Sequence, residues 1–152
     1  MRAIKIASLM ALSTIACAQA LPADQSLKSI NVIPIGGTDR PLPTLKISTV
    51  PFEESFPFHY NDVVSEKLYA ELSSLIHRKT CAGATGGVDK TVGEFGTIVV
   101  EELSQDGGMK LSCRVERPAV DEFVNAVGHI YEKERFESDA IKTWQASLKR
   151  GH

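Results

Sequence analysis

The sequence predicts one domain of the α+β class, in which a small antiparallel sheet of about four strands has helices packed on one face. Segments rich in β-branched residues occur in two pairs, and segments with apolar residues at helical spacing follow each pair. This order, strand–strand–helix–strand–strand–helix–helix, is typical of antiparallel sheets whose helices lie to one side. The chain has 152 residues, of which 43% are hydrophobic and 24% are charged, as in one ordinary globular domain.

The N-terminus has the three parts of a secretory signal peptide in their usual order. Arg2 and Lys5 form a short basic region, residues 6–16 form an apolar region, and Ala18-Gln19-Ala20 has the small-x-small pattern of a cleavage site. The apolar region is shorter than the ~18–20 residues of a membrane-spanning helix. We therefore expect a signal peptide over residues 1–20, export from the cell and no insertion into a membrane.

The chain that remains after cleavage is expected to have a flexible tail over residues 21–28 and one globular domain over residues 29–150. Cleavage removes Arg2 and Lys5, so the 17 basic residues become 15 against 19 acidic residues. Binding to nucleic acids usually depends on a basic surface that neutralises phosphates. A nucleic acid is therefore not expected as a partner of this acidic domain.

Cys81 and Cys113 are the two cysteines that remain after cleavage, and we expect them to form one disulfide bond. Paired cysteines oxidise in the secretory compartment. Cys81 follows the first predicted helix, and Cys113 shares the inward face of a predicted strand with Met109, Leu111 and Val115. Two separate buried thiols are the alternative.

The first two predicted strands cover residues 29–35 and 44–50, and residues 36–41 between them are turn formers. Pro34 restricts the first strand to an edge of the sheet or to a strand end, because proline has no N–H to donate. The second strand alternates apolar and polar residues, which indicates that one of its faces is buried.

The first predicted helix begins at Asn61, a favourable N-cap residue. It ends in the basic run His77-Arg78-Lys79, which suits the negative end of a helix. The apolar residues of this segment form one continuous stripe, as in a helix that covers a core. They are Val64, Leu68, Leu72, Leu75 and Ile76.

A second hairpin and the C-terminal helices complete the predicted domain. Residues 95–103 and 109–115 are predicted strands, joined by the turn Asp106-Gly107-Gly108. Pro118 suits the first turn of the helix that follows, and Ser138 can cap another helix. The pattern leaves open whether the C-terminal part forms two helices or one kinked helix.

The chain has no motif that predicts catalysis, a metal ion or a cofactor. Its histidines and cysteines lack the short spacings of a zinc site, and no Gly-x-Ser-x-Gly elbow of a serine hydrolase occurs. The glycine-rich loop before Lys90 has Asp89 where a phosphate-binding loop needs glycine. We therefore predict no catalytic residue set, no metal site and no cofactor.

A small secreted ribonuclease is the enzyme alternative. Such enzymes use His, Glu and Arg on an antiparallel sheet as general acids, general bases and anion ligands, and they need no cofactor. His59, Glu94 or Glu101, and Arg114 could supply these residue types, although nothing in their spacing requires it.

A segment rich in aromatic residues is the candidate binding surface. Pro51 and Pro57 bracket Phe52, Phe56 and Phe58. Aromatic residues on a pre-ordered loop lose little entropy on binding and often anchor protein interfaces. We predict that these phenylalanines bind a partner protein. The structural alternative is that they complete the hydrophobic core. The functional alternative is that the segment is a rigid loop that inhibits a protease.

The combination of a signal peptide, a small mature chain, one disulfide and no catalytic motif resembles the candidate effector proteins that filamentous fungal pathogens secrete. The resemblance covers the whole chain as an architecture. It implies a non-enzymatic protein that is secreted and extracellular, with translocation into host cells left open. It further implies that the partner is a host protein and that binding modulates host defence.

Overall fold

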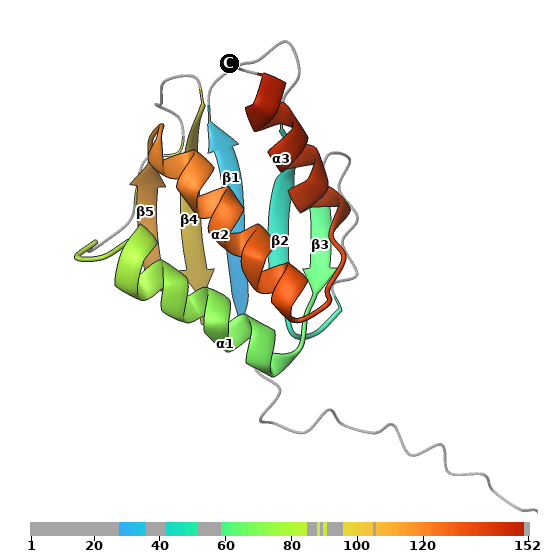
Figure 1. Cartoon of the computed structure of the whole chain (residues 1–152). Coiled ribbons are helices and arrows are strands. Elements are labelled where there is room, and N and C mark those ends of the chain that lie inside the picture. Colours follow the sequence, from blue (N-terminus) through green and yellow to red (C-terminus); the bar gives the residue numbers. More distant parts are fainter. Residues whose placement is uncertain are drawn as a thin grey trace, which may run out of the picture.

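The computed structural model describes residues 28–35, 42–51, 59–84, 88, 90, 96–104 and 106–150. These residues form one mixed sheet of five strands, with three α-helices on one of its faces (Figure 1). The fold is therefore α+β, as the sequence predicts. The expected signal peptide and residues 21–27 of the expected tail lie outside the described residues.

The five strands lie in the order β3-β2-β1-β4-β5 across the sheet. They are β1 (Ser29–Ile35), β2 (Thr44–Ser48), β3 (His59–Val63), β4 (Thr97–Leu103) and β5 (Met109–Val115). β1 is antiparallel to both β2 and β4, and β4 is antiparallel to β5. β1 is the central strand, and Pro34 is accommodated one residue before its end, where few ladder hydrogen bonds remain to be lost.

Strand β3 corrects two expectations about the chain. The sequence predicted about four antiparallel strands, whereas β3 is a fifth strand and lies parallel to β2. Asn61 was the expected N-cap of the first helix but belongs to this strand. The helix α1 (Glu66–Leu75) begins after Ser65, whose side chain accepts a hydrogen bond from the backbone N–H of Leu68 at 3.2 Å.

The last turn of the predicted first helix has a changed geometry. Residues Ile76–Thr80 form one turn of π-helix, labelled η1, which ends at Cys81. Cys81 and Cys113 lie at disulfide distance, with Cα atoms 5.5 Å apart. This pair joins the end of the helical segment to strand β5, as the sequence predicts.

The C-terminal part forms two helices, which settles the alternative that the sequence left open. They are α2 (Ala119–Lys133) and α3 (Asp139–Arg150), and Arg135 between them has a positive φ of 56°. Pro118 is the residue before α2 rather than its first helical residue. Ser138 caps α3, because its hydroxyl oxygen accepts a hydrogen bond from the N–H of Ile141 at 3.1 Å.

The core lies between the helices and the sheet face that they cover. Each strand other than β3 contributes alternate apolar residues to it, and each helix contributes its apolar stripe. Trp144 of α3 is 1% exposed, and its indole N–H donates to the carbonyl oxygen of Pro43 at 3.1 Å. Within the described residues, no helix is both long and apolar enough to cross a bilayer.

Candidate functional site

The residues of the ribonuclease alternative share one face of the sheet but do not converge. His59, Glu101 and Arg114 lie on β3, β4 and β5, and strand register places all three opposite the helix-covered face. Two strands separate β3 from β4, so at ~4.8 Å per strand His59 lies about 14 Å from the strand of Glu101. Glu94 lies outside the described residues.

Glu101 belongs to a polar row that crosses the whole sheet. The row consists of residues in register on successive strands, namely Asn61, Lys46, Asn31, Glu101 and Ser112. Glu101 is only 2% exposed, and its carboxylate lies 2.7 Å from the ammonium of Lys90. This carboxylate is therefore held in an ion pair within the fold.

Strand β3 presents exposed apolar side chains at an edge of the sheet. Tyr60 is 38% exposed and Val63 is 41% exposed, and strand register places them on opposite faces of β3. Met109, at the start of the opposite edge strand, was predicted on the inward face but is 47% exposed, because an extra residue in β5 puts it in register with Leu103. Phe52, Phe56 and Phe58 of the predicted binding segment lie outside the described residues, so their role stays a prediction.

The inward side of β3 is tied to the helices by a buried carboxylate. Asp62 accepts hydrogen bonds from the hydroxyls of Tyr131 at 3.0 Å and Ser138 at 2.7 Å. Burial raises the pKa of Asp62, and the two hydrogen bonds oppose this effect. Burial, together with the nearby charge of Asp62, also raises the pKa of Tyr131, which therefore remains a donor. The cluster fixes β3 against α2 and α3.

A second buried carboxylate, Glu102, lies on the helix-covered face of β4 and is 2% exposed. Its Oε1 accepts hydrogen bonds from the hydroxyls of Ser73 at 2.9 Å and Tyr69 at 3.3 Å. Its Oε2 pairs with Nε2 of His77. Burial and the charge of Glu102 raise the pKa of Tyr69, so its phenol stays protonated. Three successive turns of one helical segment therefore bind this one carboxylate.

Sequence reasoning missed this cluster, although two signals for it exist. Glu102 falls at the inward position of the alternation that contains Ile98 and Val100, where a carboxylate needs partners. Ser73 and His77 are four residues apart, so they lie on the same side of a helix. The pattern of the helix alone does not show which strand residue it faces.

The arrangement orients an imidazole at the protein surface. The His77 side chain is 46% exposed, and Nε2 is held by Glu102, which leaves Nδ1 without a partner among the described residues. Ser73 donates to Glu102 rather than to His77, so the hydroxyl is not paired with a general base as a nucleophile would be. The geometry therefore suits binding of a ligand or proton transfer, rather than attack by serine.

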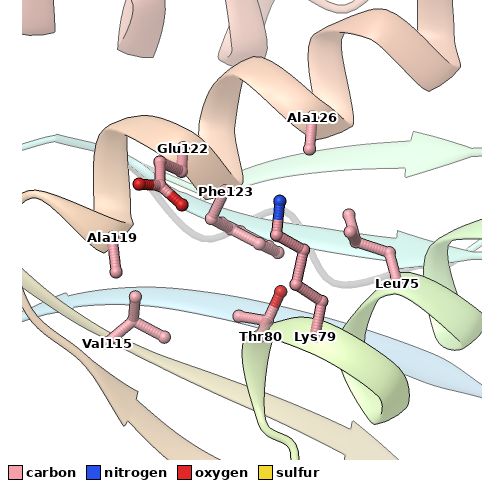
Figure 2. A pocket seen from close by; sticks show the side chains of 8 residues that line it. All are labelled: Leu75, Lys79, Thr80, Val115, Ala119, Glu122, Phe123 and Ala126. Carbon is pink, nitrogen blue, oxygen red and sulfur yellow. The ribbon is translucent and has the colours of Figure 1, made fainter.

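A small cavity near the disulfide is too small for an organic ligand. Figure 2 shows it between the end of the first helical segment and α2, with Leu75 and Phe123 among its apolar lining residues and Lys79 and Glu122 as its charged ones. Its volume is about 80 Å³, whereas ligand pockets usually measure ~300–1,000 Å³. No group of three or more potential metal ligands occurs in the part of the chain that the structure describes.

No protein-family model, no curated protein and no solved structure matches this chain.

Proposed function

We propose that the protein is exported and acts by binding a host protein, without catalysis of its own, and thereby modulates host defence. The resemblance to secreted effector proteins implies this activity. The signal-peptide pattern of residues 1–20 supports export. The pairing of Cys81 with Cys113 supports it too, because such pairs persist in oxidising compartments.

The exposed apolar edge at β3 is the observation that carries the proposal of protein binding. Tyr60 and Val63 are large exposed hydrophobic residues on a strand of only five residues. Edge strands offer backbone N–H and C=O groups to an extended segment of another chain. Exposed aromatic side chains next to such an edge supply the apolar anchor that interfaces use. The phenylalanine-rich segment directly precedes β3 in the sequence.

The same edge is pre-ordered for binding. Asp62 points to the inward side of β3, and its hydrogen bonds to Tyr131 and Ser138 hold the strand against the helices. A contact surface that is already ordered loses less conformational entropy when a partner binds. The exposed side chains of β3, Tyr60 and Val63, can therefore contribute to affinity without first having to be fixed.

The ribonuclease alternative has less support from the geometry. The reaction needs an acid, a base and a cation around one phosphate. His59 lies on one edge strand and Arg114 on the other, with three strands between them. The protease-inhibitor alternative uses residues 51–57, which precede β3 in the sequence. A peptide-cleavage assay on the captured partners distinguishes it from binding of other host proteins.

The experiment is capture of partners by the immobilised protein, collected from the medium of a eukaryotic expression host. The bait is incubated with plant-leaf and animal-cell extracts, and bound proteins are identified by mass spectrometry. We expect a specific partner that the double variant Tyr60→Ser/Val63→Thr no longer captures. Met109→Thr removes a comparable exposed side chain at the other edge of the sheet, so it is the matched control and should capture the partner normally.

Equal capture by the wild type and the β3 double variant, at equal melting temperature, would show that β3 does not contact the partner. A partner set that consists of proteases, with inhibition in a peptide-cleavage assay, would favour the inhibitor alternative. Release of fragments from RNA by the wild type, with loss of this activity in Arg114→Gln, would favour the ribonuclease alternative. Self-association in analytical ultracentrifugation that the β3 variant abolishes would show that the edge binds a second copy instead.

A further inference from the structure

A surface hollow next to Glu102 gathers positive charge around the oriented imidazole. The hollow measures about 410 Å³, within the ~300–1,000 Å³ range of small-molecule sites. Its lining includes His77, Ser73, Lys28, Arg78 and Lys110. The ion pairs between described residues include none of the three cationic residues Lys28, Arg78 and Lys110. The hollow therefore has cationic groups available to a ligand.

A β-bulge brings Lys110 into this hollow. Glu102 is in register with Leu111, and the next residue of β4, Leu103, is in register with Met109, so Lys110 is the extra residue on β5. Strict alternation would place Lys110 on the opposite face, with Ser112. Bulges re-aim side chains in this way and often lie next to functional sites. As a result Lys110 lines the same hollow as Glu102.

The carboxylate of Glu102 does not cancel the positive charge of the hollow toward a ligand. It is 2% exposed, and it is already bound by Tyr69, Ser73 and His77. Glu66 is the other carboxylate in the lining, against three cationic side chains. Glu102 instead fixes the imidazole of His77, which leaves Nδ1 available for a ligand.

We propose that this hollow binds a small phosphate monoester, with Lys110, Arg78 and Lys28 around the phosphate and the protonated imidazole of His77 donating a hydrogen bond to it from Nδ1. Arginine and lysine are the side chains that bind phosphate oxygens most strongly, because their hydrogen bonds to the phosphate are charge-assisted. A small ligand fits better than a polynucleotide, because the hollow is limited in size and the mature chain is acidic overall. The site is independent of the contact proposed at β3, since Lys110 belongs to β5 at the other edge of the sheet.

Calorimetric titration of the disulfide-bonded protein at physiological salt tests the proposal. The probes are adenosine 5′-monophosphate, inorganic phosphate, adenosine and a short RNA oligonucleotide. We expect saturable binding of the monophosphate and weaker binding of inorganic phosphate, with none of adenosine. The variants Lys110→Gln and Arg78→Gln should each weaken binding about tenfold or more, because each removes a charge-assisted contact.

Lys79→Gln is the matched control. Lys79 is the sequence neighbour of Arg78, but it lines the small cavity of Figure 2 rather than the hollow. The Lys79→Gln variant should bind the monophosphate as the wild type does. In the wild type, the amide NMR shifts that change on binding should be those of Ser73, His77, Lys110 and their neighbours. Lys110 is exposed, so its substitution leaves the fold intact even if variants of buried Glu102 do not fold.

Three outcomes would overturn the proposal. One is the absence of saturable monophosphate binding at millimolar concentration. Another is an equal loss of affinity in Lys79→Gln and Lys110→Gln, which would indicate unspecific attraction of anions. The third is binding of RNA without binding of the monophosphate, which would identify a polynucleotide as the source of the phosphate.

Discussion

The hydroxyl of Ser138 donates a hydrogen bond to the carboxylate of Asp62 at 2.7 Å, across 76 positions of the sequence. The same oxygen of Ser138 accepts from the N–H of Ile141 and caps helix α3. One side chain therefore fixes the start of a helix and, at the same time, an edge strand of the sheet. Tyr60 and Val63 of that strand form the proposed contact surface, so the position of this surface depends on the buried pair.

The stability of the protein should report the burial of Asp62 through its dependence on pH. Burial raises the pKa of Asp62 above the usual 3.8, so the folded state binds the proton more tightly than the unfolded state does. The favourable contribution of protonated Asp62 is present below about pH 4 and is lost as the pH rises through the raised value. Compared with Asp62→Asn, which does not titrate, the wild type should therefore lose free energy of unfolding over this window. Urea unfolding of both proteins between pH 3.5 and 7 measures this difference in the free energy of unfolding. A rise in the stability of the wild type relative to Asp62→Asn with increasing pH would contradict the prediction.

The two serine caps should differ in their contribution to stability. Ser65 caps α1 through one hydrogen bond, whereas Ser138 caps α3 and also binds buried Asp62. Ser65→Ala should cost about 1 kcal/mol, the usual value for a lost N-cap. Ser138→Ala should cost about 2–3 kcal/mol, because it also removes a partner of a buried carboxylate. Equal losses in chemical denaturation would show that the bond to Asp62 adds nothing.

Removal of the Cys81–Cys113 bond should destabilise the protein strongly. The bond joins residues 32 apart in sequence, and loss of such a bond typically costs about 2–5 kcal/mol in a small secreted domain. The double variant Cys81→Ala/Cys113→Ala should therefore unfold at much lower urea concentration. Thiol titration of the unreduced, unfolded mature protein should find no free thiol, and two reactive thiols would refute the bond.

Export should produce a shortened chain. In a eukaryotic secretory host, the protein in the medium should begin at Leu21, because the small-x-small pattern ends at Ala20. N-terminal sequencing or intact-mass measurement identifies the first residue. Exported protein that retains Met1 would be incompatible with a cleaved signal peptide.

The three phenylalanines next to β3 should separate into contact and core residues. If Phe52, Phe56 and Phe58 bind a partner, alanine at each position should weaken capture and leave the melting temperature nearly unchanged. If one of them completes the core, its replacement should cost about 3–5 kcal/mol. Thermal denaturation and capture, measured on the same three variants, distinguish these roles. Unfolding by all three would refute the binding segment.

The α+β class, the inward positions of most apolar residues in two of the predicted strands and the position of the cysteine pair follow from the sequence. These features depend on local periodicity, because alternation at a period of two places Leu111, Cys113 and Val115 on one face without knowledge of the rest of the fold. The same holds for Ser138 as a cap, since the bond it receives comes from Ile141, three residues later. Residues close in sequence carry this information.

Only the tertiary structure decided the strand β3, the cluster at Glu102 and the position of Lys110. Asn61 is locally a good N-cap, but Asp62 finds its partners at Tyr131 and Ser138, and these distant hydrogen bonds favour the extended strand over a longer helix. Lys110 reaches the hollow because a bulge in the pairing of β4 with β5 changes its face. These features depend on the free energies of contacts between segments that are far apart in the chain. Local sequence patterns do not predict such contacts.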